Sequence, residues 1–189
     1  MAKRLLDLIL ASLGLIISSP AILLCMIVIR STSPGPSLFA QTRLGRSRRE
    51  FTLYKLRTMQ QGTTALPTHL ADPSTITTFG RTLRRWKIDE LPQLWNVIRG
   101  DMSLVGPRPC LPTQIALIDA RQKSGAFNVR PGITGLAQVL GIDMSRPDVL
   151  AEIDGHYAHT RTLRRDMIIL FQTLSGRGLR QDPMTHHPQ

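Results

Sequence analysis

The sequence predicts an α+β fold that is mainly helical, with an N-terminal membrane helix followed by a small helical domain that contains one short β-hairpin. Three observations predict it: a bilayer-length apolar segment, two strand-like runs around a glycine, and five helical segments further along. At 189 residues the chain can bury the core of one compact domain. We expect residues 1–32 to form the membrane element, residues 33–178 the main domain, and residues 179–189 a loose tail.

The apolar segment runs from Leu8 to Ile29 and carries no ionisable side chain apart from the thiol of Cys25. A helix of this length can span the hydrocarbon core of a bilayer. The segment lacks an Ala-x-Ala cleavage site and leads into an arginine-rich domain, which argues against a secretory signal peptide. It therefore predicts a membrane-inserted helix.

Ser19 and Pro20 interrupt this segment near its midpoint. Proline removes a backbone donor and clashes with the preceding turn, and a serine hydroxyl can satisfy the carbonyl that is freed. Two forms are open: a kinked helix that crosses the bilayer, and a re-entrant helix that returns to the side it came from. Lys3 and Arg4 precede the segment and further arginines follow it, so the positive-inside rule places the main domain in the cytoplasm in both forms.

Residues 38–42 and 51–56 predict two strands of a hairpin around a basic turn. Helical signals follow at five segments: 78–86, 91–99, 111–123, 147–160 and 165–174. Helical periodicity does not explain two stretches between them, at 100–109 and 129–138. Each sets one arginine among Pro and Gly residues, which fix the backbone and allow a ligand to approach closely. The structural alternative for each is a rigid turn whose arginine pairs with a carboxylate.

The formal net charge is +11, and 20 of the 24 basic residues are arginine. Arginine binds phosphate in a planar, bidentate geometry, so the candidate partners are nucleic acid, an anionic membrane surface and a phosphorylated substrate. Aromatic residues make up only 5% of the chain and no nucleic-acid docking motif is present, which argues against nucleic-acid binding. No Walker or Rossmann glycine-rich loop supports ATP or NAD chemistry.

Asp89 and Glu90 are the only adjacent pair of carboxylates in the chain. They follow the basic run 81–87 and precede an apolar helical signal. One carboxylate of such a pair can attack an anionic substrate or bind a metal ion while arginines hold the phosphates. The alternative is an acidic first helical turn that interacts with the helix dipole, with Pro92 in an early helical position.

Several blocks of the chain resemble, in order and spacing, the bacterial sugar transferase family, the monotopic phosphoglycosyl transferases. The resemblance covers the chain from about Lys3 to Leu174. The matching blocks are residues 3–7, 19–20, 33–36, 41–45, 54–59, 89–97, 100–109 and 129–135. A lone Asp-Glu-Leu-Pro would be a weak signal, whereas this ordered set is a specific one.

The resemblance implies a re-entrant membrane helix and a catalytic domain on the cytoplasmic face of the bacterial inner membrane. It implies transfer of a phosphosugar from a UDP-sugar to undecaprenyl phosphate, a polyprenyl phosphate, with undecaprenyl diphosphate-sugar and UMP as products. This is the first membrane step of surface glycan assembly, as in O-antigen or exopolysaccharide synthesis. The implied partners are the donor, the lipid acceptor and inner-membrane phospholipids, without nucleic acid. The oligomeric state stays open, with a homodimer as one alternative.

The family's functional residues map onto particular positions of this sequence. The resemblance implies that Asp89 and Glu90 form the catalytic dyad, that Asp89 forms a covalent intermediate, and that Asp89 contacts Mg²⁺, the implied cofactor. The candidates for binding phosphate or nucleotide are Lys55, Arg57, Arg84, Pro107, Arg108 and Arg130. The candidates at the membrane or the lipid acceptor are Lys3, Arg4, Ser19 and Pro20.

Residues 141–145 resemble a subgroup associated with N-acetylated, in some members 6-deoxy, amino-sugar donors. Among enzymes, the alternative is an undecaprenyl-phosphate hexose-1-phosphate transferase with the same chemistry. From other classes, the alternatives are a membrane-anchored scaffold and a basic nucleic-acid-binding protein. Retention of the Asp89-Glu90 pair argues against a scaffold without activity.

Overall fold

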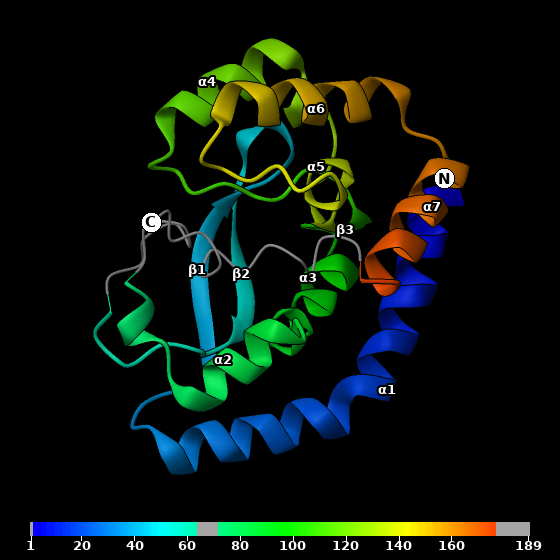
Figure 1. Ribbon diagram of the computed structural model, residues 1–189. Helices are drawn as coiled ribbons and strands as arrows, with labels where there is room; N and C mark the ends of the chain where they lie inside the picture. Colours follow the sequence, from blue (N-terminus) through cyan, green and yellow to red (C-terminus); the bar gives the residue numbers. More distant parts are fainter. Residues whose placement is uncertain (1, 64–71, 177–189) are drawn as a thin grey trace. The chain divides into compact units, whose positions relative to one another are not determined.

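The computed structural model describes residues 2–63 and 72–176 (Figure 1). The chain divides into two compact units, residues 1–43 with 50–104 and residues 44–49 with 105–189. The α+β, mainly helical fold with a long apolar N-terminal helix and a short hairpin is confirmed. The predicted loose tail at 179–189 lies outside the described residues.

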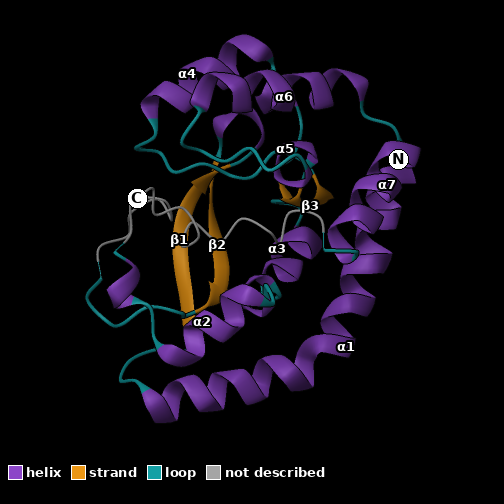
Figure 2. Cartoon of the chain, in the orientation of Figure 1, coloured by secondary structure: helices purple, strands orange, loops and turns teal. Residues whose placement is uncertain are grey.

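The first unit contains the long N-terminal helix, the hairpin, whose strands lie side by side in Figure 2, and several short helices. Its elements in chain order are α1 (Ala2–Thr32), β1 (Leu38–Leu44), β2 (Glu50–Leu56), η3 (Pro73–Thr75), α2 (Thr78–Arg85), η4 (Ile88–Glu90), α3 (Gln93–Arg99) and β3 (Ser103–Val105). The last residues of β1 and β3 belong to the second unit.

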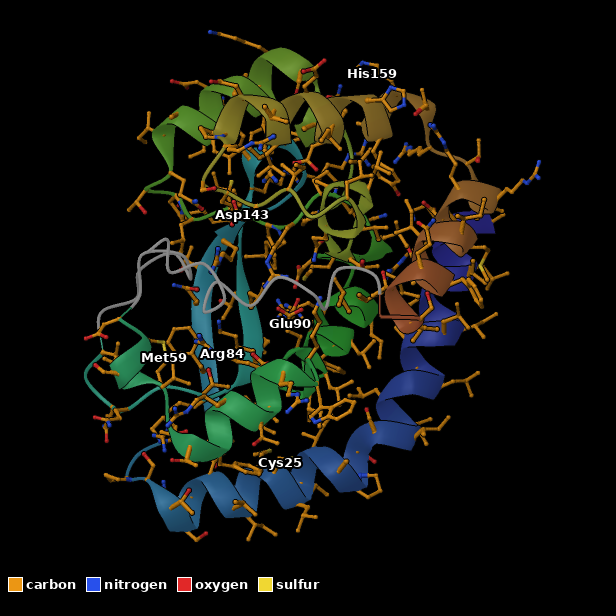
Figure 3. The ribbon with its side chains drawn as sticks, viewed as in Figure 1. Cys25, Met59, Arg84, Glu90, Asp143 and His159 are labelled. Atoms are coloured by element: carbon orange, nitrogen blue, oxygen red, sulfur yellow. The ribbon has the colours of Figure 1, made fainter. Side chains whose placement is uncertain are left out.

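The helix α1 is continuous over 31 residues but strongly bent, as its blue ribbon shows in Figure 1. Pro20 has no N–H to donate to the carbonyl of Ile16, and the Ser19 hydroxyl donates to that carbonyl instead, at 2.8 Å. Cys25, labelled in Figure 3, lies on the arm that follows the bend. The serine therefore lets the helix bend without leaving the freed carbonyl unsatisfied.

One face of α1 is apolar and exposed, while the other supplies part of the core. The large exposed side chains on α1 are Leu5, Ile9, Leu13, Ile16, Ile17, Leu23, Leu24 and Ile27. On the opposite face, Ile22 and Ile29 are buried in a cluster with Leu56 of β2 and Leu83 of α2. By length and composition, α1 is the one helix of the described chain that could cross a membrane.

The arm of α1 before the bend is tied to β3 by Asp7, whose carboxylate is buried. This carboxylate accepts hydrogen bonds from Ser103 Oγ at 2.8 Å and from the N–H of Leu104 at 3.1 Å. Hydrogen bonds to a buried charge are among the stronger ones in proteins. Asp7 therefore fixes the start of α1 against the body of the first unit.

Asn96 attaches α3 to the hairpin. Its side chain is fully buried; Nδ2 donates to the carbonyl of Thr52 at 2.7 Å, and Oδ1 accepts from the N–H of Tyr54 at 3.1 Å. These two bonds are the pair that a neighbouring strand would form with β2. The amide thus replaces a strand at this position of β2.

The second unit is built around two packed helices, α4 and α6. Its further elements are η1 (Arg46–Arg48), α4 (Ile115–Ser124), η5 (Ala126–Asn128), β4 (Gly132–Thr134), α5 (Leu136–Val139), α6 (Pro147–Thr160) and α7 (Leu163–Leu174). Its core contains Leu117 of α4, Phe127 of η5, and Leu150 and Ala151 of α6.

The helix α7 has two different faces. Asp166 and Ile169 are buried, whereas the opposite face is apolar and exposed. The exposed apolar side chains of α7 are Leu163, Met167, Ile168, Phe171 and Leu174. Phe171 is 73% and Leu174 85% exposed, which is unusual for side chains of this size in a water-soluble surface.

Candidate active site

Asp89 and Glu90 lie in the 3-10 helix η4, between α2 and α3. Lys87, directly before η4, has left-handed dihedral angles (φ 54°, ψ 23°), which end α2 and redirect the chain. The helix α3 begins only at Gln93, with Pro92 at its N-cap position. The carboxylates therefore occupy a turn of their own and not the first turn of α3.

The two carboxylates of the pair differ in exposure. Asp89 is buried, with 6% of its surface exposed, while Glu90 is only partly buried. Their neighbours Ile88 and Leu91 pack against the apolar cluster to which α1 contributes. The arrangement suits one carboxylate that reacts away from water and a second that stays in contact with solvent.

Arg84, labelled with Glu90 in Figure 3, is held in place by Thr58. Its Nε donates to Thr58 Oγ1 at 2.9 Å. The carbonyl of Thr58 also accepts from the N–H of Thr77, the N-cap of α2, at 3.0 Å. A Cβ atom on Gly80 would collide with this carbonyl, so the absence of a side chain lets α2 approach it. Thr58 thus sets the position of both α2 and the Arg84 guanidinium.

Lys55 and Arg57 lie on β2 and directly after it, but their surroundings differ. Lys55 Nζ lies 5.3 Å from the centroid of the Phe39 ring, within range of a cation–π interaction. Arg57 is only 8% exposed, and its Nη1 and Nη2 donate to the carbonyls of Pro34 and Ser33 at 2.6 and 2.8 Å. Arg57 therefore secures the turn by which the chain leaves α1.

Lys3 and Arg4 lie in the first turn of α1, and both are partly buried. Arg4 Nη1 donates to the carbonyl of Val97 at 2.6 Å and Nη2 to that of Ile98 at 2.9 Å. These carbonyls are in the last turn of α3, where a cation also interacts favourably with the helix dipole. Arg4 therefore connects the start of α1 to α3.

The structure places Pro107, Arg108 and Arg130 in the second unit, on two loops that are hydrogen-bonded to each other. The N–H of Gly106 donates to the carbonyl of Thr134 at 2.8 Å. A Cβ atom on Gly106 would collide with the carbonyl of Arg130. From the sequence, the glycines of these stretches are expected to let a ligand approach closely. In the structure, Gly106 instead lets the second loop approach the first.

Three buried residues that hold elements together within one unit or the other have no role assigned from the sequence. Asp7 and Asn96 hold α1 and α3 in the first unit, and Arg121 forms a buried ion pair with Asp154 in the second. Asn96 carries a signal that could have been used, since a buried amide within an apolar helical segment requires hydrogen-bond partners. The partners themselves are distant in sequence.

Among the described residues, no group of three or more His, Cys, Asp or Glu side chains could hold a metal ion by itself. Asp89 and Glu90 supply two adjacent carboxylates. Mg²⁺ is commonly bound by one or two carboxylates together with substrate phosphates and water. This donor set fits Mg²⁺ in combination with a phosphorylated substrate.

Comparison with known proteins places these features in a family. The family profile described as "Bacterial sugar transferase" matches residues 1–177. A UDP-glucose:undecaprenyl-phosphate glucose-1-phosphate transferase of Caulobacter vibrioides is 41% identical over 184 residues, covering 91% of this chain and 68% of that protein. A sugar transferase of Bacillus subtilis is 40% identical over 172 residues, covering 91% of this chain and 85% of that protein.

A third relative is longer than this chain. A UDP-N-acetylgalactosamine-undecaprenyl-phosphate N-acetylgalactosaminephosphotransferase of Aeromonas hydrophila is 36% identical over 179 residues, covering 91% of this chain. The chain spans 42% of the length of that protein. The similarity therefore concerns one part of the Aeromonas protein and nearly all of the chain described above.

Proposed function

Because the chain belongs to the bacterial sugar transferase family, we propose that it transfers a phosphosugar from a UDP-sugar to undecaprenyl phosphate, with undecaprenyl diphosphate-sugar and UMP as products. Like its named relatives, it is a phosphoglycosyl transferase. The observation that carries the proposal is the buried Asp89 beside Glu90, on a turn whose flanking residues pack against α1. This packing joins the reactive carboxylate to the apolar helix on which a lipid acceptor would approach.

The proposed reaction has two steps, both at Asp89. In the first, a carboxylate oxygen attacks the phosphorus that bears the sugar, and the bond from that phosphorus to the bridging oxygen breaks, so that UMP leaves with that oxygen. In the second, a phosphate oxygen of undecaprenyl phosphate attacks the same phosphorus. The acyl phosphate bond then breaks and the Asp89 carboxylate is regenerated. Donor and acceptor need not be bound at the same time, which suits a water-soluble donor and a lipid acceptor.

The other polar residues assist these steps in the proposal. Glu90 retains contact with solvent and would position the acceptor phosphate or accept its proton. The candidates for offsetting the phosphate charge of the donor are Lys55 and Arg84, and the candidate for binding the nucleotide diphosphate is Arg108. Mg²⁺, with Asp89 as its protein ligand, supplies further neutralisation of the diphosphate when it is bound.

We propose that α1 is re-entrant and that the catalytic domain faces the cytoplasm of the bacterial inner membrane. Both arms of α1 are attached to the first unit: Arg4 and Asp7 secure the first arm, and Ile22 and Ile29 of the second are buried in the apolar cluster. A straight spanning helix would carry its ends to opposite sides of the bilayer. The exposed apolar face of α1 would contact lipid chains.

The apolar stripe of α7 is a second candidate for lipid contact. Phe171 and Leu174 would insert at the level of the headgroups, and the exposed Arg164 and Arg165 at the start of α7 would attract anionic lipids. A helix with an exposed apolar face and basic residues at one end can lie in the membrane interface.

For the donor, we propose an N-acetylated amino sugar, with 6-deoxy forms among the candidates, because residues 141–145 resemble the amino-sugar subgroup. The second candidate is a hexose, and the name of the Caulobacter relative favours glucose. The name of the Aeromonas relative favours N-acetylgalactosamine. The donor panel in the experiment below includes all of these sugars.

The test is UMP release by purified protein in nanodiscs with Mg²⁺, for a panel of UDP-sugars with and without undecaprenyl phosphate. We expect acceptor-dependent UMP release from one donor class and none from Asp89→Asn. Without acceptor, wild-type protein should gain the mass of one phosphosugar. Folded, membrane-bound wild-type protein that neither releases UMP nor binds UDP would contradict the proposed reaction.

A further inference from the structure

The segment 105–111 of the second unit has an unusual pattern of exposure. Every residue in it is buried except Arg108, which is partly exposed. The segment therefore presents one side chain and hides the rest. A single side chain presented in this way meets a ligand in a reproducible position only if the backbone that carries Arg108 is held in place.

The backbone of residues 105–108 is held at every one of its four residues by hydrogen bonds from the second unit. The Tyr157 hydroxyl lies 3.0 Å from the carbonyl of Val105, and Arg121 Nη1 donates to the carbonyl of Arg108 at 2.8 Å. Between them, the N–H of Gly106 donates to Thr134 at 2.8 Å, and the carbonyl of Pro107 accepts from the N–H of Gly132 at 2.9 Å. The side chains that bind the two ends of the loop come from α4 and α6.

These side chains are themselves part of buried polar networks. Arg121 and Asp154 are each 2% exposed, and Arg121 Nε and Nη2 donate to Asp154 Oδ2 at 3.0 and 2.6 Å. The Tyr157 hydroxyl shares its proton between Val105 and Asp166, whose Oδ1 lies 2.7 Å away. Buried ion pairs seldom stabilise a fold more than well-packed apolar side chains of similar volume. Besides their contacts with the two aspartates, Arg121 and Tyr157 both donate hydrogen bonds to the backbone of this loop.

We propose that Arg121, Asp154 and Tyr157 are positioning residues for the nucleotide diphosphate, and act by fixing the backbone from which Arg108 extends. The proposal rests on the proposed function, in which Arg108 binds the diphosphate. Asp154 orients the guanidinium of Arg121, so that its third nitrogen meets the Arg108 carbonyl. Tyr157 fixes the other end of the loop at Val105.

Two conservative variants separate positioning from folding. Arg121→Lys keeps a positive charge for Asp154 but lacks the planar fork that reaches Asp154 and Arg108 together. Tyr157→Phe removes one hydroxyl and leaves the ring in the core. The matched controls are Tyr54→Phe, which changes the only other tyrosine, and Arg146→Lys, at an exposed position before α6.

The measurements are the dissociation constant for UDP, the KM for the UDP-sugar donor, and the rate at which phosphosugar-loaded enzyme transfers to undecaprenyl phosphate. For Arg121→Lys and Tyr157→Phe we expect the first two to rise roughly three- to tenfold, the factor that one lost hydrogen bond produces. The transfer step, which no longer involves the nucleotide, should stay within about twofold of wild type. The control variants should match wild type in all three.

A purely structural role predicts a different result. In that case both variants would lower Tm while the UDP dissociation constant and the donor KM stayed at wild-type values, and this result would overturn the positioning role alone. An equal loss in both half-reactions would overturn it as well. Wild-type protein that binds no UDP and releases no UMP would overturn the proposed function and the positioning role with it.

Discussion

Buried polar side chains make different kinds of contact in the two units. In the first unit, three of them attach different segments: Asp7 connects α1 to β3, Asn96 connects α3 to β2, and Arg57 holds the turn after α1. In the second unit, Arg121 and Tyr157 bind the two ends of one four-residue loop. The first unit thus uses buried polar groups to attach α1 and to join α3 to the hairpin, whereas the second uses them to fix a loop.

The largest expected effect is on activity, and it tests whether the reaction takes place at Asp89 in the first unit. Asp89→Asn replaces the proposed nucleophile with a side chain of nearly the same shape, so we expect UMP release to fall by at least about 10⁴-fold. The Tm of the variant shows whether the lost activity reflects a loss of folding. Both are measured on purified protein in nanodiscs.

The control for this variant is Asp119→Asn, at an exposed position of α4 in the second unit. It makes the same chemical change, and we expect wild-type activity. If Asp89→Asn retained more than a tenth of wild-type activity while Asp119→Asn behaved normally, Asp89 would not be the nucleophile.

The next largest effect is on stability, and it tests the buried ion pair between Arg121 and Asp154 in the second unit. Burial raises the pKa of Asp154, and the Arg121 guanidinium opposes that rise. Arg121→Met removes the guanidinium and leaves the buried carboxyl group of Asp154 without its cation. We therefore expect the free energy of unfolding to fall by about 3 to 5 kcal/mol at pH 7. Chemical denaturation followed by far-UV circular dichroism measures this loss, because both tryptophans of the chain lie in the first unit.

The same variant has a predicted pH dependence. A carboxyl group whose pKa is raised in the folded state keeps its proton to higher pH than in the unfolded chain. Its contribution to stability is therefore fully present below the unfolded pKa and is lost as pH rises through the folded pKa. The difference in free energy of unfolding between wild type and Arg121→Met should thus be smallest near pH 4 and grow toward pH 7. A deficit that is independent of pH would show that Asp154 is not the group responsible.

A smaller loss of stability is expected when the hydrogen bonds between Asp7 and β3 are removed. Asp7→Ala leaves the Ser103 hydroxyl and the Leu104 N–H without their buried acceptor. We expect a loss of about 2 to 3 kcal/mol, the range for hydrogen bonds to a buried charge. Asp148→Ala, at an exposed position of α6, is the control and should stay within about 0.5 kcal/mol of wild type. Equal stability of the two variants would refute the role of Asp7.

The smallest effect compares two serines of α1 that form the same type of hydrogen bond. Ser19 donates to Ile16, whose carbonyl lacks an N–H partner because of Pro20, whereas Ser31 donates to Val28, whose carbonyl also accepts from Thr32 Oγ1. Ser19→Ala should therefore lower stability by about 1 kcal/mol, and Ser31→Ala by clearly less. Thermal unfolding in the same nanodiscs distinguishes them. A larger loss for Ser31→Ala would contradict the assigned role of Ser19 in the bend.

Much of the architecture can be predicted from the sequence because it depends on local patterns. The apolar length of α1, its interruption at Pro20, and the helical periodicity of α6 and α7 are all readable within short windows. Several boundaries differ, most clearly at α4, which begins at Ile115, whereas the sequence predicts a start at residue 111. Pro112 has no N–H, and the side chain of Gln114 accepts from the N–H of Leu111 at 2.9 Å, so these residues form a separate turn.

The organisation of the site is harder to predict because it depends on contacts between distant residues. Asn96 bonds to β2 more than forty residues earlier in the chain, and Asp7 to residues more than ninety later. Nor does the sequence distinguish Arg57, which donates to the carbonyls of the turn after α1, from Arg84, which donates to Thr58 Oγ1. Residue type predicts which side chains can bind phosphate, but the fold decides which of them are used for structure.

The two faces of α1 have a consequence for how this segment can vary among related proteins. Under the proposed membrane insertion, its outer face requires only side chains that are soluble in lipid, whereas Ile22 and Ile29 must fit the cluster against which Ile88 and Leu91 pack. A generic apolar anchor grafted in place of α1 would leave the turn that carries Asp89 and Glu90 without part of its support. In homologous sequences, the positions of α1 that vary freely should therefore recur with a helical period. In a simple anchor, all positions would accept apolar substitutions equally.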